Sequence, residues 1–72
     1  MKLAIGSDYR VTEAVVGIHR VEVGTVDHQH ETIGYVLETG DLFVSLSGPV
    51  YNTSVEIGQS LDLDAAVGLL IH

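Results

Sequence analysis

The sequence has no cysteine and no tryptophan, a single proline and only three basic side chains among its 72 residues. Without cysteine the chain forms no disulfide, and zinc sites built on thiolates are excluded. Its longest apolar stretches, residues 14–18 and 68–71, are too short to cross a membrane or to serve as the apolar segment of a signal peptide. We therefore expect a soluble, cytoplasmic protein with no membrane partner.

Negative charge dominates the composition. Ten acidic residues against Lys2, Arg10 and Arg20 give a formal net charge of −7 at pH 7, which argues against direct binding to nucleic acid. The acidity has three explanations: solubility, attraction to a basic partner, or adaptation to high salt. The acids are scattered singly along the chain, which weakens the idea that they imitate the phosphates of a nucleic acid.

A chain of this length is expected to be one domain, residues 1–72. Such a domain buries only about 60% of the surface that its unfolded chain exposes, so its core is small. Hydrophobic residues nevertheless make up 46% of the sequence. With no disulfide to add stability, association with another chain is the route that remains.

The C-terminal residues 61–72 have the only clear amphipathic helical pattern, and we predict a helix at about 62–71. Asp62 is placed to cap it, and Asp64 lies near the positive end of the helix dipole. A helix this short needs a surface to pack on. The expected apolar stripe consists of Ala66, Leu69 and Leu70.

The residues before the helix predict strands and turns. Residues 2–6 predict a first strand ending in a turn at Gly6–Asp8. The valine-rich residues 12–26 predict either one long strand bent at Gly17 or two strands.

The clearest hairpin joins residues 32–38 to residues 42–47 through Thr39–Asp41, where Gly40 can adopt a positive φ. In its second arm an aliphatic set alternates with Phe43 and two serines, and we expect the aliphatic set to face the core. That set is Leu42, Val44 and Leu46.

Residues 50–57 predict a last strand, followed by a turn at residues 58–60 that leads into the helix. The fold class is therefore α+β and mainly β. We expect a small antiparallel meander of four to six strands within residues 2–57, packed by one C-terminal helix.

The polar segment Asp27–Glu31 is where a metal site would begin. His28 and His30 are two residues apart, so an extended backbone projects both to the same side. With Glu31 beside them, and His19 on a neighbouring strand, they offer imidazole and carboxylate ligands for zinc or a similar divalent ion. A solvated surface loop is the alternative interpretation.

The same segment resembles in part the first motif of the cupin family, in which an H-x-H pair is followed by a glutamate and a strand leading to glycine. Here His28, His30 and Glu31 precede residues 33–38 and Gly40. The resemblance implies metal ligation by the two histidines and Glu31. It covers about twenty residues, the second cupin motif is absent, and the chain is shorter than the usual cupin barrel.

Other catalytic patterns are missing from the sequence. The serines have no G-x-S-x-G context, and no glycine-rich phosphate loop is present. Asp62 and Asp64 are explained by helix capping. We expect a non-enzymatic protein without a cofactor, a divalent metal being the one exception retained as a hypothesis.

Two sets of residues are candidate interfaces. Tyr35 and Phe43, if they are cross-strand neighbours with Tyr51 nearby, would form an exposed aromatic patch. Val67 and Ile71 lie off the predicted helical stripe and are expected to be partly exposed. Ordinary packing within the fold is the alternative for all five.

The sequence thus favours a small acidic protein-interaction module that self-associates, or that inhibits or regulates a larger protein, including one with a basic surface. A metal-binding protein of cupin type and a structural subunit of a larger assembly are the alternatives.

Overall fold

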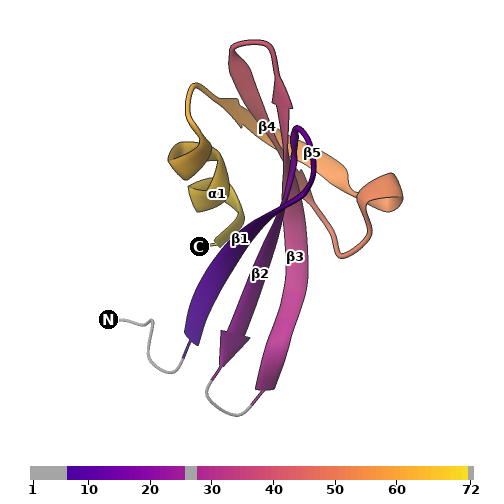
Figure 1. Ribbon diagram of the computed structural model, residues 1–72, viewed down its shortest axis with the longest axis vertical. Helices are drawn as coiled ribbons and strands as arrows, with labels where there is room; N and C mark the ends of the chain where they lie inside the picture. The colour runs from indigo at the N-terminus through magenta and orange to yellow at the C-terminus, as the bar shows by residue number, and fades with distance from the viewer. Residues whose placement is uncertain (1–6, 26–27, 72) are drawn as a thin grey trace.

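The chain forms an antiparallel sheet of five strands followed by one helix (Figure 1). The computed structural model describes residues 7–25 and 28–71. Each strand pairs with the next one along the chain, so the sheet is a simple meander, and the predicted fold class is confirmed. The strands are β1 (Ser7–Val15), β2 (Ile18–Thr25), β3 (His28–Thr39), β4 (Leu42–Ser47) and β5 (Val55–Ser60).

Helix α1 (Leu63–Ile71) begins where the sequence predicts. The Asp62 Oδ1 atom accepts a hydrogen bond from the backbone N–H of Ala65 at 2.8 Å, so Asp62 is the N-cap. Among the described residues, no helix has the length and apolar character that crossing a membrane requires.

Glycine turns connect the first strands as two hairpins. Gly17 has a φ of 85° in the two-residue turn between β1 and β2. Of the two predicted alternatives for residues 12–26, the structure therefore has two strands and not one bent strand. Gly40 has a φ of 60° in the turn between β3 and β4, and the predicted hairpin is confirmed.

The first strand and the last strand differ from the prediction. Ser7 and Asp8, expected in a turn, belong to β1, while the strand predicted at residues 2–6 lies outside the described residues. The last strand begins at Val55 instead of residue 50 and continues to Ser60, through the turn predicted at residues 58–60.

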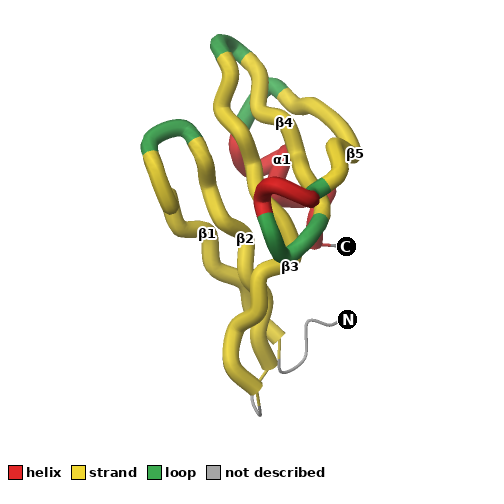
Figure 2. The backbone as a smooth tube through the Cα atoms, turned by 90° about the vertical axis from the view of Figure 1, so that its right-hand side faces the viewer, coloured by secondary structure: helices red, strands yellow, loops and turns green. Residues whose placement is uncertain are grey.

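Local hydrogen bonds explain the late start of β5. A short 3-10 helix, η1 (Tyr51–Thr53), precedes it, and the Ser54 hydroxyl donates to the Tyr51 carbonyl oxygen at 2.6 Å. Hydroxyl side chains that bond nearby carbonyls in this way compete with strand pairing. Figure 2 shows η1 on the opposite side of the sheet from α1.

The sheet face beneath α1 carries the core. Val21 and Val36 are fully buried there, together with Ala66 and Val67 from the helix. The helical stripe in contact is therefore Leu63, Ala66, Val67 and Leu70, spaced i, i+3, i+4 and i+7. Leu69, predicted in the stripe, is 37% exposed.

In β4, the face toward α1 is the opposite of the predicted one. Phe43 packs against the core, and the fully buried Ser45 hydroxyl donates to the Ala66 carbonyl oxygen at 2.8 Å. The prediction that Leu42, Val44 and Leu46 face the core is therefore wrong for the core beneath the helix, although Val44 itself is buried, with 8% of its surface exposed. Strict alternation of side chains gives β4 two faces that could meet the core. The helix packs on the face that carries Ser45, a small residue that can bond the helix backbone.

Two glycines allow α1 to approach the sheet closely. A Cβ atom at Gly34 would collide with the Leu46 carbonyl oxygen and lie 2.8 Å from a Leu70 methyl carbon, and one at Gly58 would lie 2.8 Å from a Leu69 methyl carbon. Gly58 therefore serves helix packing within a strand, which explains why it does not form the predicted turn.

The close approach at Gly34 is tested by replacing it with alanine. Gly34→Ala should lower the free energy of unfolding by about 2–3 kcal/mol, because the added methyl meets backbone that cannot move away cheaply. Gly68→Ala is the matched control: a Cβ there meets nothing within 4 Å, and alanine in a helix should raise stability by about 0.5–1 kcal/mol. Urea unfolding followed by circular dichroism measures both, and equal effects would contradict the packing argument.

The Ser45 hydrogen bond is tested separately. Ser45→Ala should destabilise the fold by about 1 kcal/mol, since it removes a buried bond between sheet and helix. Ser47→Ala, two residues along the same strand and exposed, should change stability by less than about 0.5 kcal/mol. The interpretation fails if the two variants melt at the same temperature.

Candidate functional site

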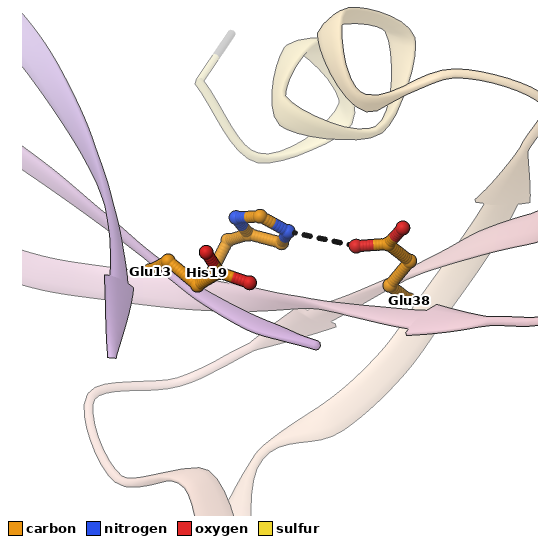
Figure 3. A group of neighbouring side chains, drawn as sticks. All are labelled: Glu13, His19 and Glu38. Carbon is orange, nitrogen blue, oxygen red and sulfur yellow. Dashed lines mark hydrogen bonds and ion pairs between the residues drawn. The ribbon is translucent and has the colours of Figure 1, made fainter. Parts of the chain in front are cut away.

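Three ionisable side chains from three adjacent strands converge on the face of the sheet that carries α1 (Figure 3). Glu13 of β1 lies directly opposite His19 of β2, and His19 lies opposite Val36 of β3. Glu38 is two residues beyond Val36, so strand alternation brings it to the same face. We call Glu13, His19 and Glu38 the His19 cluster.

The His19 cluster is tightly grouped. The His19 Nε2 and Glu38 Oε1 atoms are 3.3 Å apart, and one potential ligand atom from each of the three residues lies within 4.8 Å of the others. The His19 side chain is only 13% exposed, whereas Glu38 is open to solvent. The arrangement can therefore share a proton between imidazole and carboxylate, or hold a cation with access from water.

The turn between β1 and β2 bonds to both glutamates. The Gly17 N–H donates to Glu13 Oε2 at 3.1 Å, and the Gly17 carbonyl oxygen accepts the backbone N–H of Glu38 at 2.8 Å. A single glycine therefore contacts both glutamates, through the side chain of one and the backbone of the other. The turn and the cluster form one unit.

The electrostatic surroundings of the His19 cluster are negative. Strand alternation places Arg10 and Arg20 on the opposite face of the sheet, and Arg10 pairs there with Glu22 at 3.0 Å. Lys2 lies outside the described residues. Within residues 7–25 and 28–71, no lysine or arginine faces the two cluster glutamates.

The metal ligands predicted from the sequence lie elsewhere. Glu31 is exposed on β3 opposite Val23, and His28 pairs with Thr25 near the far end of β2 from His19. The structure describes the backbone of His28 and His30 but not their side chains. Since Glu31 is five residues from the partner of His19, roughly 17 Å along the strand, the predicted grouping of His19 with these residues is wrong.

Sequence reasoning missed Glu13 and Glu38. For Glu13, a two-residue turn at residues 16–17 would by itself make Ala14 the cross-strand neighbour of His19. The register between β1 and β2 shifts between Glu13 and Val15, so simple counting from the turn would give the wrong partner. No local pattern points to Glu38.

The predicted aromatic patch is split between the two faces of the sheet. Tyr35 lies opposite Leu46 and Phe43 opposite Glu38, so the two rings are not cross-strand neighbours. Tyr35 and Tyr51 do meet, edge to face with centroids 5.6 Å apart, and the Tyr35 hydroxyl donates to the Pro49 carbonyl oxygen. Phe43 packs against the core under α1 instead.

The two candidate interface residues on the helix, Val67 and Ile71, differ in exposure. Val67 is 4% exposed and belongs to the core, so the expectation that it remains exposed is wrong. Ile71 is 37% exposed and remains available to a partner.

A larger apolar surface lies on β5 and α1. Leu61, in the link between the two elements, is 79% exposed, and Val55 and Ile57 on the edge strand are 65% and 48% exposed. We call this group the β5–α1 surface; its members are Val55, Ile57, Leu61, Leu69 and Ile71.

Acidic residues are interspersed with the β5–α1 surface. Glu56 stands between Val55 and Ile57 in the strand, Asp62 follows Leu61, and Asp64 lies in the first turn of α1. The apolar members of the surface therefore have acidic neighbours along the chain, which we call its acidic rim.

Comparison with known proteins gives no relative: no family model, no curated protein and no solved structure matches this chain. The partial resemblance to cupins gains no support from these searches. Function must be argued from the residues themselves.

The placement of Phe43 yields a direct test of core against surface. Phe43→Ser should destabilise the fold by about 2–4 kcal/mol, because it removes a ring packed against the core. Leu61→Ser, which removes a side chain exposed to solvent, should change stability by less than about 0.5 kcal/mol. Thermal unfolding compares the two variants, and a stable Phe43→Ser protein would return this ring to the list of interface candidates.

Proposed function

We propose that this protein is a non-enzymatic interaction module that buries its β5–α1 surface against a partner protein with an apolar centre and basic surroundings. The proposal rests on an inversion of the usual distribution of side chains, in which small residues are buried and large aliphatic ones are exposed. The fully buried positions hold small residues such as Val21, Val36 and Ala66, while large aliphatic side chains such as Ile57 and Leu61 stand in solvent.

Exposed aliphatic side chains can contribute free energy to binding. Burying a large aliphatic side chain completely is worth about 1.5–3 kcal/mol, and the β5–α1 surface offers five such side chains, each already partly buried. Where such side chains lie together they mark interaction sites, because soluble monomers rarely leave large contiguous apolar patches in water. A surface of this kind is typical of a chain that works in contact with another protein.

The edge position of β5 adds a second attraction. β5 is the last of the described strands in the sheet, so no described strand pairs with its outward backbone N–H and C=O groups. Such an edge can accept a further strand or an extended segment from a partner. The register shift between Ser45 and Leu46 in their pairing with β5 makes that edge irregular, which disfavours simple edge-to-edge stacking of identical chains.

Charge favours a basic partner over a second copy. Glu56, Asp62 and Asp64 would face their own copies or lie close to them in a symmetric dimer, and two chains of −7 repel. A basic protein would instead be attracted over distance and paired at the rim. Homo-oligomerisation and incorporation into a larger assembly are therefore outcomes that the experiments must separate from this proposal.

The first test is the absolute mass of the purified protein by light scattering at about 0.1 M and about 1 M salt. We expect the mass of one chain at low salt, because repulsion between acidic rims opposes dimer formation there. A closed dimer or higher oligomer at both salt concentrations would replace the basic partner with a second copy of this chain.

The second test uses a surface variant and a matched control. Ile57→Ser with Leu61→Ser should abolish capture of the partner from cell extract, whereas Val16→Ser, which removes an aliphatic side chain 94% exposed at the other end of the sheet, should retain it. Captured protein should be released as ionic strength rises. Equal capture by all variants, or capture that salt does not weaken, would contradict the proposal.

A further inference from the structure

Beyond protein interaction, we propose that the His19 cluster is a binding site for a divalent transition-metal ion of the zinc type. One imidazole nitrogen and two carboxylates are the donor set that borderline ions accept. Calcium and magnesium are a poorer match, because calcium takes six or more oxygen ligands and magnesium demands a near-ideal octahedron of oxygens.

The spacing of the donor atoms fits coordination. With zinc–nitrogen and zinc–oxygen bonds of about 2.0–2.2 Å, two ligands of a tetrahedral site are about 3.4 Å apart. The His19 Nε2 and Glu38 Oε1 atoms are 3.3 Å apart, and Glu13 brings an oxygen within 4.8 Å of the others. Small side-chain rotations are enough to bring all three to a shared ion.

Rigid elements hold these ligands in place. Each ligand stands on a different strand of the same sheet, and His19 is largely enclosed. Glu13 is oriented by the Gly17 N–H through one carboxylate oxygen, which leaves its other oxygen for a ligand bond. Exposure of Glu13 and Glu38 admits water to complete the coordination.

The charge on this face also favours a divalent cation. Glu13 and Glu38 together carry two negative charges, and both described arginines lie on the opposite face. A proton on His19 offsets only one of these charges, whereas a divalent cation offsets both.

The test is isothermal titration of the whole metal-free chain with zinc chloride, together with thermal unfolding. We expect one zinc ion per chain. At a free zinc concentration of ten times Kd, the melting temperature should rise by roughly 6–11 °C. Magnesium at the same concentration should leave it unchanged.

Substitution of single glutamates tests which residues bind the zinc ion. Glu13→Gln keeps a carbonyl oxygen for the Gly17 N–H and removes the charged ligand, so zinc affinity should fall at least about tenfold while the melting temperature without zinc is retained. Glu38→Gln should weaken binding in the same way. Glu31→Gln removes an equal charge from an exposed position on the same strand as Glu38, and should bind zinc as the parent does.

The double variant His28→Ala with His30→Ala separates this site from the one that the sequence predicts. Its zinc affinity should equal that of the parent. The proposal is overturned if the double variant loses zinc while Glu13→Gln and Glu38→Gln keep it, if no variant changes the affinity, or if the parent chain binds no zinc.

Discussion

Everything in this fold depends on how closely one short helix can lie on a twisted sheet. The residues beneath α1 are small for that reason: Gly34 and Gly58 leave room for leucine side chains, and Ser45 bonds directly to the helix backbone at Ala66. A helix of nine residues is marginal by itself in water, so this contact holds it in place. The sheet in turn gains cover for the core that Val21 and Val36 form.

Close packing over small side chains has a consequence at the edges. Because glycine and serine occupy the interior, much of the large aliphatic content of the chain is left for β5, the link after it and the outer side of α1. The same choice of small interior residues therefore gives both a tight helix contact and an exposed apolar surface. In a chain with no disulfide, burial of that surface against a partner would add to the stability of the fold.

The elements that could be read from the sequence are those set by local rules. The helix cap at Asp62 and the hairpin at Gly40 depend on residues close in sequence. The face of β4 that meets the helix, the strand role of Gly58 and the approach of Glu38 to His19 depend on register and on what packs opposite, which no local pattern encodes. The histidines at positions 28 and 30 are close in sequence, whereas the three members of the His19 cluster come from three strands.

The short link of two residues between β5 and α1 joins the edge strand to the helix that covers the core. The two elements can therefore detach together as one cooperative unit, opening the core without dissolving the β1–β3 hairpins. A partner bound across both elements would hold that unit closed, and amide hydrogen exchange in α1 would slow in proportion to occupancy. Binding at the edge strand would thus lower the frequency with which the core opens to solvent.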